Sequence, residues 1–371
     1  MQIEIYNMIP VGENISISLE AVCDSFSSLL WDIEYYKCGA FEVYIAASPR
    51  NIEIFQTGRI VGRDDDKEHF GLIESVELET DAEDGDYLII KGRFLTCLLE
   101  RRIIYPTFNF TKFVSYSQIV MNVVQYNACT SGIRKIPGLV VGCSSGTCLD
   151  AKTKLQVSYD NLMEWVYTIC EKIGGTANIR LSKTNNEQYE MIFELSQGTD
   201  RSILQKINPH IIFSDRYNNL LSFTYFTDTS VKKNYAYVLG KGEGEKRKRT
   251  TYFEGTEPSS LDRYEVYVDA KDISDEEQEN GETKPLSEKE YAELLKEKGK
   301  QNLVPITMKS ESQIAVQSTQ FQYGVDYFVG DFVTVEHQRF GIRQNKIQLV
   351  GMIESFDRNG KNLTPTFKEM E

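Results

Sequence analysis

The sequence has few of the residues from which local catalytic and metal sites are built, beginning with histidine. Only three histidines occur among 371 residues, His69, His210 and His337, and none has the HExxH or HxH spacing that puts two metal ligands side by side. The chain also lacks a G-x-S-x-G nucleophile elbow and a G-x-x-x-x-G-K-S/T phosphate loop. We therefore predict no catalytic, cofactor-binding or metal-binding residues, and a protein that is not an enzyme.

Basic residues are outnumbered by acidic ones. Lys and Arg total 41 against 55 Asp and Glu, which gives a net charge of -14, and such a balance repels phosphate backbones and anionic lipids. Nowhere do eighteen apolar residues run together, and the chain does not open on a basic segment followed by an apolar core. We therefore expect synthesis and folding in a cytoplasm, no membrane binding by the chain itself and no adhesion to DNA.

Paired cysteine motifs are missing as well. The seven cysteines form no CxxC pairs, so we expect reduced thiols and not a disulfide or metal framework. Tryptophan numbers two, whereas Tyr and Phe number 21 and 19, and this balance suits half-buried strands better than a helical bundle. Because 371 residues exceed what one hydrophobic core usually serves, we predict a β-rich α+β chain of two to four domains.

The first half of the chain predicts two domains of different kinds. Residues 1–105 read almost wholly as alternating strands, including the hairpin "GLIESVELETDAEDGDYLIIKGRFL", and indicate a first antiparallel β-barrel-like domain. Residues 106–200 change period: a Ser115-x-x-Gln118 capping box opens one helix, and a second apolar stripe at helical spacing ends at Gly174. We therefore place a small α+β domain at 106–200.

Strand patterning returns in the second half. It predicts a second β-barrel-like domain built from residues 201–268 and 303–371. Residues 269–302 interrupt it: an acidic stretch, "DAKDISDEEQENGETKP", reads as a loop, and Ser287-x-x-Glu290 caps a helix with an apolar side. We expect this insertion to be an acidic loop followed by a helix.

One short pattern occurs twice, as "GLIESV" at 71–76 and as "GMIESF" at 351–356. Each copy follows a β-rich run with a charged turn, and strand alternation predicts that Gly71, Ile73 and Ser75 share one face, as their counterparts do. Two interpretations stay open: convergent strand chemistry, or two related β-barrel-like domains in one chain.

An acidic turn, "GRDDDKEHFG", collects Asp64, Asp65, Asp66, Glu68 and His69. These residues offer enough oxygen donors for a cation site. Consecutive carboxylates in a turn, however, point in different directions and repel one another, so we favour a solvated turn.

Two basic segments supply candidate interface residues. In "LLERRII", Glu100, Arg101 and Arg102 lie between apolar pairs, which indicates either a salt-bridged surface at the end of an element or arginines that cross a subunit boundary. In "GKGEGEKRKR", a strand-like segment follows where a phosphate cradle would need a helix, so we expect a hairpin or bulge whose basic end meets an acidic surface, within the chain or on a partner. The candidates in this second segment are Gly240, Gly242, Gly244, Arg247 and Arg249.

Taken in order, several segments resemble the tail (baseplate) hub proteins at the distal end of siphophage-type tails, which are also found in phage-tail-like particles. The segments are "GRDDDKEHFGLIESVELETDAEDGDYLIIKGRFLTCLLERRII", "VLGKGEGEKRKRT", the acidic loop and helix before "NLVPITM", and "DYFVGDFVTVEHQRFGIRQNKIQLVGMIESFDRNG". The resemblance covers most of the chain in order and is vaguer over residues 106–200.

The resemblance implies a homotrimer that forms a ring beneath the tail tube. Three chains with two equivalent barrels each would present six similar surfaces to the sixfold tube and keep threefold symmetry toward the spike, fibre or tail tip. The implied partners are tail tube or distal tail proteins and spike, fibre or other baseplate proteins, with DNA or a tape-measure protein passing through the ring. The implied location is the bacterial host cytoplasm during synthesis and then the virion tail or a phage-tail-like particle.

Two other function classes stay open. A tail-associated cell-wall hydrolase would draw on plentiful Asp and Glu, although no recognisable paired-carboxylate context exists. A receptor- or glycan-binding tail protein would account for the 21 tyrosines.

Overall fold

The structure is a computed structural model. It describes residues 1–12, 14–81, 85–130, 132–183, 189–279, 282–304, 307–314 and 320–368.

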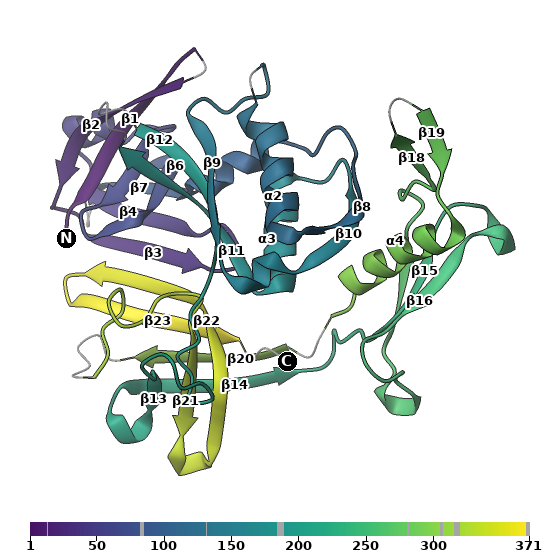
Figure 1. Cartoon of the computed structure of the whole chain (residues 1–371). Helices are drawn as coiled ribbons and strands as arrows, with labels where there is room; N and C mark the ends of the chain where they lie inside the picture. The colour runs from purple at the N-terminus through teal and green to yellow at the C-terminus, as the bar shows by residue number, and fades with distance from the viewer. Residues whose placement is uncertain are drawn as a thin grey trace.

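Strands dominate the N-terminal unit (Figure 1), and their apolar residues alternate into its interior. Its helix α1 begins where Ser48 accepts a 3.0 Å hydrogen bond from the Asn51 amide and Pro49 takes the first helical position. The elements are β1 (Ile3–Val11), β2 (Asn14–Cys23), β3 (Ser28–Glu34), β4 (Ala40–Ala46), α1 (Pro49–Ile54), β5 (Ile60–Arg63), β6 (Asp66–Asp81) and β7 (Gly85–Phe94).

The next unit mixes helices and short strands. Two helix signals predicted from the sequence are confirmed: Ser115 caps α2 by accepting from the Gln118 amide, and Gly174 ends α3 in the left-handed region with a φ of 73°. The elements are η1 (Leu95–Arg101), β8 (Phe108–Ser115), α2 (Tyr116–Val124), η2 (Gln125–Cys129), β9 (Leu139–Ser145), η3 (Thr147–Asp150), β10 (Lys152–Val157), α3 (Leu162–Ile173), β11 (Gly175–Lys183) and β12 (Tyr189–Gln197).

The C-terminal unit is again made of strands, and it collects segments from both sides of an insertion. Its core includes Phe213, Val333, Leu349 and Phe367, all fully or almost fully buried. The elements are β13 (Ile212–Ser214), η4 (Asp215–Tyr217), β14 (Leu220–Asp228), β20 (Thr307–Ile314), β21 (Phe332–His337), η7 (Gln338–Phe340), β22 (Ile342–Asp357) and β23 (Gly360–Lys368).

The inserted unit leaves the C-terminal unit after β14 and returns to it at β20, and these two strands pair with each other. The predicted Ser287–Glu290 capping box is present at the start of α4. Two observations differ from expectation. Strands β15 to β17 share a core with α4 and so lie in this unit, and part of the acidic loop forms the β18–β19 hairpin. The elements are β15 (Tyr235–Leu239), η5 (Gly244–Lys246), β16 (Arg249–Tyr252), η6 (Ser260–Asp262), β17 (Glu265–Asp269), β18 (Glu276–Glu279), β19 (Glu282–Pro285) and α4 (Glu288–Gln301).

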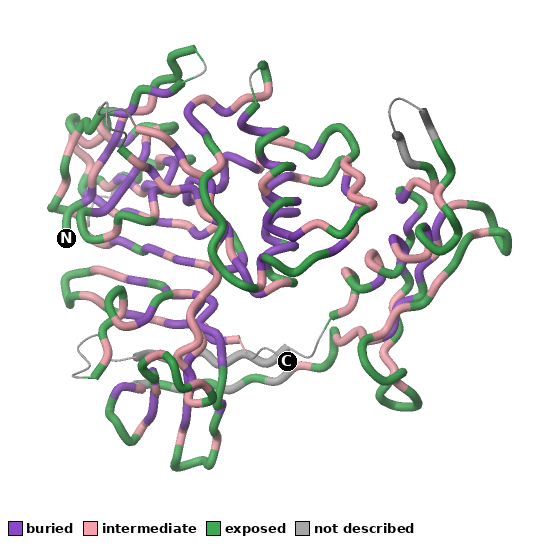
Figure 2. The backbone as a smooth tube through the Cα atoms, viewed as in Figure 1, coloured by how far each residue is buried: buried purple, intermediate pink, exposed green. Residues whose placement is uncertain are grey.

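The units differ in how much they bury. Figure 2 shows buried residues concentrated in the N-terminal sheet and around α2 and α3, whereas the inserted unit is mostly exposed or half-buried. One continuous core joins the α+β unit to residues of the N-terminal unit such as Tyr6, Ile60 and Leu72. The inserted unit keeps a small core of its own around Val238, Tyr291 and Leu295.

A single sheet runs through both β units. Its strand order is β14-β20-β23-β22-β3-β4-β7-β6-β5-β1-β2, with β21 added beside β22 and β13 beside β21. The β-rich α+β class is therefore confirmed. Closure into barrels is not seen among the described strands, because β3, which would have to pair with β2 to close the N-terminal unit, pairs with β22 instead.

The two β units nevertheless share a three-stranded antiparallel meander. In each, a short strand (β5 or β21) is followed by a 16-residue strand (β6 or β22) and then by a third strand (β7 or β23). The long strand pairs with the short one along its first part and with the third along the remainder. The repeated pattern lies in the long strand of each meander.

The residues of the two repeats lie in different surroundings, although strand alternation predicted the same arrangement of faces in both copies. In β6 the pairing register shifts between Ile73 and Ser75, so Glu74 lies in a bulge and points to solvent, while Ile73 is buried. In β22 the shift falls earlier, between Leu349 and Gly351. Glu354 is consequently buried, whereas the counterpart of Ile73 is partly exposed.

No helix within the described ranges is long and apolar enough to cross a membrane.

The first glycine of each repeat makes a matched pair for mutation. A Cβ added at Gly71 would lie 2.3 Å from the buried ring of Phe41, whereas one added at Gly351 would lie 3.4 Å from Thr366, an ordinary contact. We expect Gly71→Ala to destabilise the chain by about 1–3 kcal/mol through overpacking and Gly351→Ala to change stability by less than about 0.5 kcal/mol. Urea unfolding of the full chain checks both, and equal midpoints for the two variants would contradict the packing described here.

Candidate functional site

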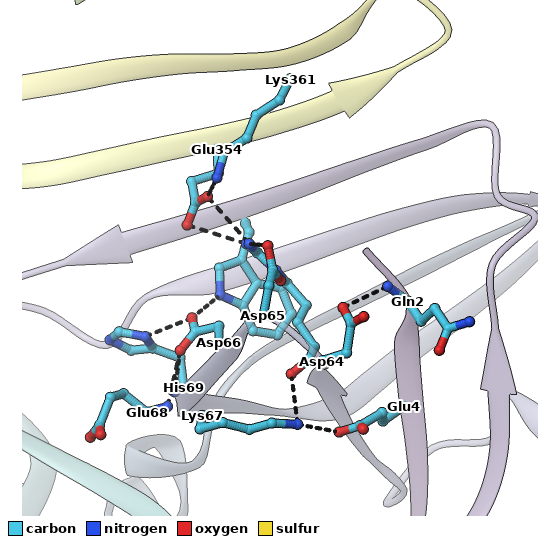
Figure 3. A network of polar contacts seen from close by, with 12 residues as sticks. Gln2, Glu4, Asp64, Asp65, Asp66, Lys67, Glu68, His69, Glu354 and Lys361 are labelled. Atoms are coloured by element: carbon cyan, nitrogen blue, oxygen red, sulfur yellow. Dashed lines mark hydrogen bonds and ion pairs between the residues drawn. The ribbon is translucent and has the colours of Figure 1, made fainter. Parts of the chain in front are cut away.

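A buried arginine lies where the two β units meet. Arg63, at the end of β5, binds Asp65 through two hydrogen bonds of 2.8 Å, and its Nη1 and Nη2 atoms lie 3.2 and 3.3 Å from the Glu354 carboxylate oxygens. The Arg63 and Glu354 side chains are 2% and 4% exposed. Figure 3 shows Glu354 reaching down from the C-terminal strands toward the acidic turn of the N-terminal unit.

Aromatic rings and a lysine complete the surroundings of this ion pair. The Arg63 guanidinium lies 4.8 Å from the Phe356 ring centre and 5.5 Å from that of Trp31, and Lys361 forms a second ion pair with Glu354. Fork-shaped hydrogen bonding and stacking on aromatic faces both favour arginine over lysine at such a position. We name this group the Arg63 junction; its members are Trp31, Arg63, Asp65, Asp66, His69, Glu354, Phe356 and Lys361.

Asp66 links the junction to its flank. Its Oδ2 atom accepts a 3.0 Å hydrogen bond from the Trp31 indole and lies 2.9 Å from His69 Nδ1, and its Oδ1 atom accepts from the amides of Glu68 and His69. The carboxylate therefore has a partner on each oxygen. It fixes both the indole that stacks on Arg63 and the histidine.

These contacts shift the ionisation of the charged groups. Burial opposes the charge in every case, but the neighbours outweigh it: Asp65 and Glu354 raise the pKa of Arg63, Arg63 lowers the pKa of Asp65, and His69 with backbone amides lowers the pKa of Asp66. Asp66 likewise raises the pKa of His69 above its usual value of 6.5. The junction is thus held together by charges that are each stabilised by an opposite partner.

A second junction follows β3 directly. Tyr35 donates a 3.2 Å hydrogen bond from its hydroxyl to the Gly174 carbonyl at the end of α3, and Tyr36 donates one of 2.5 Å to Gln348 in β22. Gln348 in turn donates to the Gly330 carbonyl at 2.9 Å. Gly330 has a φ of 101°, and a Cβ there would lie 2.2 Å from the Tyr35 ring, so only glycine fits. This junction ties the α+β unit to both β units.

The arrangement is suited to holding units together. A hollow of about 330 Å³ between the two junctions is lined by residues of the N-terminal, α+β and C-terminal units, among them Tyr35, His69, Asn178 and Asp331. Asp331 is bound to Arg201 at 2.8 Å and to the Thr199 amide at 2.7 Å. Among the described residues, no group of three or more His, Cys, Asp and Glu is placed to hold a metal ion.

The first predicted interface segment lies at the surface of the α+β unit. Arg93 engages Glu100 at 2.6 Å, and Arg102 donates to the backbone carbonyl of Arg134 at 2.6 Å, so these two residues are used within the chain. Arg101, at the end of η1, is exposed. All three border a shallow hollow that is also lined by Ile103, Tyr105, Ile133 and Arg134.

The second predicted segment connects β15 to β16 in the inserted unit. Arg247 donates to the Gly240 carbonyl at 2.9 Å and pairs with Asp269 at 2.5 Å, so its acidic partner lies within the chain. Gly242 has a φ of 114° and Gly244 one of 52°, which are turn conformations that favour glycine. Exposed Arg249 begins β16. The two predicted segments are in separate units and neither belongs to the Arg63 junction.

The sequence reading missed the Arg63 junction. It treated Asp64 to Asp66 as a solvated turn, yet Asp65 and Asp66 are engaged by Arg63, Trp31 and His69. The partner that changes their environment, Glu354, is 291 residues away from Arg63 in the chain. The only local signal was the repeated Gly-x-Ile-Glu-Ser pattern, which contains Glu354 but not its partner.

The repeated glutamates make a matched pair for testing the junction. Glu354→Gln leaves the buried Arg63 without one of its two carboxylates, and we expect a loss of about 3–5 kcal/mol in the free energy of unfolding. Glu74 pairs with Arg93 where both side chains are one-third exposed, so Glu74→Gln should cost less than about 1 kcal/mol. Denaturant unfolding measures both, and a loss for Glu354→Gln no larger than that for Glu74→Gln would refute the role given to the junction.

The raised pKa of His69 predicts a pH dependence. Its contribution to stability is complete below the unfolded value of 6.5 and is lost as pH rises through the folded pKa. We expect the wild-type free energy of unfolding to fall between pH 6.5 and the higher folded value by more than that of Asp66→Asn, in which the imidazole has lost its carboxylate partner. Parallel pH profiles for the two proteins would contradict the proposed pairing.

Comparisons with known proteins agree with this architecture. Residues 3–367 match the family described as Siphovirus ReqiPepy6 Gp37-like protein, and curated protein sequences give no match. Solved structures similar to the chain include the tail protein from Neisseria meningitidis MC58, with 14% identity and a TM-score of 0.57 over 99% of this chain and 96% of that one. The 43 kDa tail protein of prophage MuSo2 from Shewanella oneidensis has 11% identity and a TM-score of 0.56 over 99% of this chain and 98% of that one. Prophage tail protein gp18 from Listeria monocytogenes EGD-e has 11% identity and a TM-score of 0.54 over 100% of this chain and 95% of that one.

At such identities the structural similarity shows a shared fold. The family match, in contrast, extends over nearly the whole chain and confirms the resemblance to siphophage tail proteins. The chain belongs to the Siphovirus ReqiPepy6 Gp37-like family of phage tail proteins.

Proposed function

We propose that this tail protein is a non-enzymatic hub that forms a trimeric ring and adapts the sixfold tail tube to the threefold tail tip, spike or fibre. The observation that carries the proposal is the pair of matching meanders, β5-β6-β7 and β21-β22-β23, held in one continuous sheet. A chain with two similar strand-built shapes contributes two similar outer surfaces, and three chains contribute six.

Such an adaptor requires the two units to keep a fixed relative orientation. The pairing of β3 with β22 supplies backbone hydrogen bonds. The Arg63 junction adds side-chain contacts where Glu354 is opposite Trp31, and the Tyr35–Tyr36 junction adds others just beyond the Glu34 end of β3. These contacts resist rotation of one unit against the other. In a ring, they would set the angle between adjacent docking surfaces.

Charge is distributed in a way that fits passage through the ring. Residues 1–94 contain 19 Asp and Glu against 7 Lys and Arg, so most of the net charge of -14 lies in the N-terminal unit. An acidic wall repels the phosphate backbone and prevents the counterion release that makes DNA adhere. We infer that the N-terminal unit contributes to a lumen through which DNA or a tape-measure protein moves.

The basic segment of the α+β unit is the candidate contact between copies. Exposed Arg101 lies beside a hollow with Ile103, Tyr105 and Ile133, which are all more than half exposed. Arginine and aromatic residues around an apolar patch are typical of protein interfaces. Its complement would be the acidic N-terminal unit of the next copy, and the tail tube, distal tail proteins and spike or fibre proteins would occupy the two faces of the ring.

A reconstruction of the assembled tail tip tests the proposal. We expect three copies in a ring, with the two meanders of each copy alternating at roughly sixty-degree steps beneath the tube and the N-terminal unit at the lumen. A map with six copies, or one in which a single meander of each copy reaches the tube, would refute the adaptor role. Placement of the acidic unit on the outer rim would refute the lumen assignment alone.

A further inference from the structure

The inserted unit exposes an aromatic face that the hub function does not use. Its three-stranded sheet has the order β16-β15-β17, and one side of it, with Ala236, Val238 and Val268, packs against α4. Because side chains alternate across a strand, Tyr237 and Tyr267 point to the other side. The two tyrosines are register partners on neighbouring parallel strands, so they lie side by side, 39% and 58% exposed.

Arginines hold these two rings in place. Arg263 donates to the Tyr237 hydroxyl at 3.0 Å and stacks on the neighbouring Tyr235, with 3.5 Å between its guanidinium carbon and the ring centre. Arg247 donates to the Tyr267 hydroxyl at 2.9 Å. Rings fixed in this way lose little conformational entropy when a ligand covers them. We name this surface the tyrosine face; its members are Tyr237, Arg247, Arg249, Glu257, Arg263, Glu265, Tyr267 and Asp269.

The charges of the tyrosine face are balanced within it. Arg247 pairs with Asp269 at 2.5 Å, and Arg263 pairs with Glu265 at 2.6 Å. The Tyr237 hydroxyl also donates to Glu265 at 3.2 Å. Arg263 also pairs with Glu257 at 3.1 Å, and strand alternation places Arg249, the register partner of Leu239, on the same side of the sheet. Three guanidiniums and three carboxylates leave no net charge to attract a phosphate backbone or an acidic peptide. The face is complementary to a ligand that is uncharged and rich in hydrogen-bonding groups.

The size of the face selects between a protein and a smaller ligand. Strands lie about 4.8 Å apart and alternate residues along a strand about 6.7 Å apart, so three strands and three rows span about 10 by 13 Å. A stable protein interface buries about 800 Å² on each partner, several times this area. A short run of sugar rings, which are apolar on their faces and carry hydroxyls at their edges, matches both the extent and the balanced charge.

We propose that the tyrosine face binds a neutral glycan. The rings of Tyr237 and Tyr267 stack on the apolar faces of consecutive sugar units, while the carboxylates of Glu265 and Asp269 accept hydrogen bonds from sugar hydroxyls at the edge. The binding is independent of ring formation, because the face lies on the unit inserted between β14 and β20 and not on either meander. The inserted unit would thereby give a tail tip affinity for a polysaccharide surface.

Calorimetric titration of the full chain tests this inference. The ligands are three neutral oligosaccharides, cellohexaose, maltohexaose and chitohexaose, with dextran sulfate as the anionic comparison. We expect at least one neutral ligand to bind in the millimolar range or better. Tyr237→Ala with Tyr267→Ala should weaken that binding at least about tenfold, because both aromatic stacking surfaces are removed. Tyr237→Phe with Tyr267→Phe should retain most of it, because the ring faces remain.

Tyr217→Ala is the matched control. Tyr217 is 41% exposed, similar to the 39% of Tyr237, but it lies in η4 of the C-terminal unit, away from the tyrosine face. Its loss should therefore leave glycan affinity unchanged. Thermal unfolding of every variant confirms that the fold is intact. Failure of all three neutral ligands to bind, preference for dextran sulfate, or equal weakening by Tyr217→Ala would each overturn the proposal.

Discussion

The ion pair between Arg63 and Glu354 is the contact on which the arrangement of the two β units depends. Removing two charges from water costs several kcal/mol for each ion, and an ion pair repays that cost only when its other hydrogen-bonding positions are also filled. Here Asp65 and Lys361 supply further opposite charges, and the rings of Trp31 and Phe356 cover the guanidinium. An ion pair surrounded in this way by further charges and aromatic rings is stable only in one relative position of its two strands. Slipping β22 by one residue against β3 would turn Glu354 to the opposite face and leave Arg63 unpaired, so the junction selects the register as well as adding to stability.

That register determines the path of the rest of the chain. β22 pairs with β3, β21 and β23, and the strand edges that each β unit would need to close on itself are used to join the two units. The two halves therefore behave as one sheet, to which the α+β unit is fixed by a shared core and by Tyr35. The inserted unit is attached differently: β14 and β20 carry it at the far end of the sheet, with a separate small core. Rigidity is concentrated at the center of the molecule, and variation in the insertion can occur without disturbing it.

The sequence predicted what local rules govern. The β-rich class, the caps at Ser115 and Ser287 and the end of a helix at Gly174 follow from spacing within a few residues. Contacts between distant segments could not be read in that way: Arg63 has an acidic turn beside it, and nothing near it indicates that Glu354 arrives from the other end of the chain. The acidic run was expected to be a loop because its charges repel, yet β18 and β19 pair there.

The divergence within the repeat follows from the same constraint. In the proposed ring, equivalence is needed only on the surfaces that meet the tube, and those surfaces depend on backbone geometry. The meanders preserve that geometry through a 16-residue strand in each unit. Interior positions have no reason to match, because one unit presents a glutamate to its partner and the other must present an arginine. Glu354 is therefore buried against Arg63, while Glu74, at the same place in the motif, lies in a bulge and binds Arg93 at the surface. The contact between the two β units is necessarily asymmetric, because one side of it carries a glutamate and the other an arginine. The Gly-x-Ile-Glu-Ser pattern therefore supplies a buried ion-pair partner in the C-terminal unit and a surface salt bridge in the N-terminal unit.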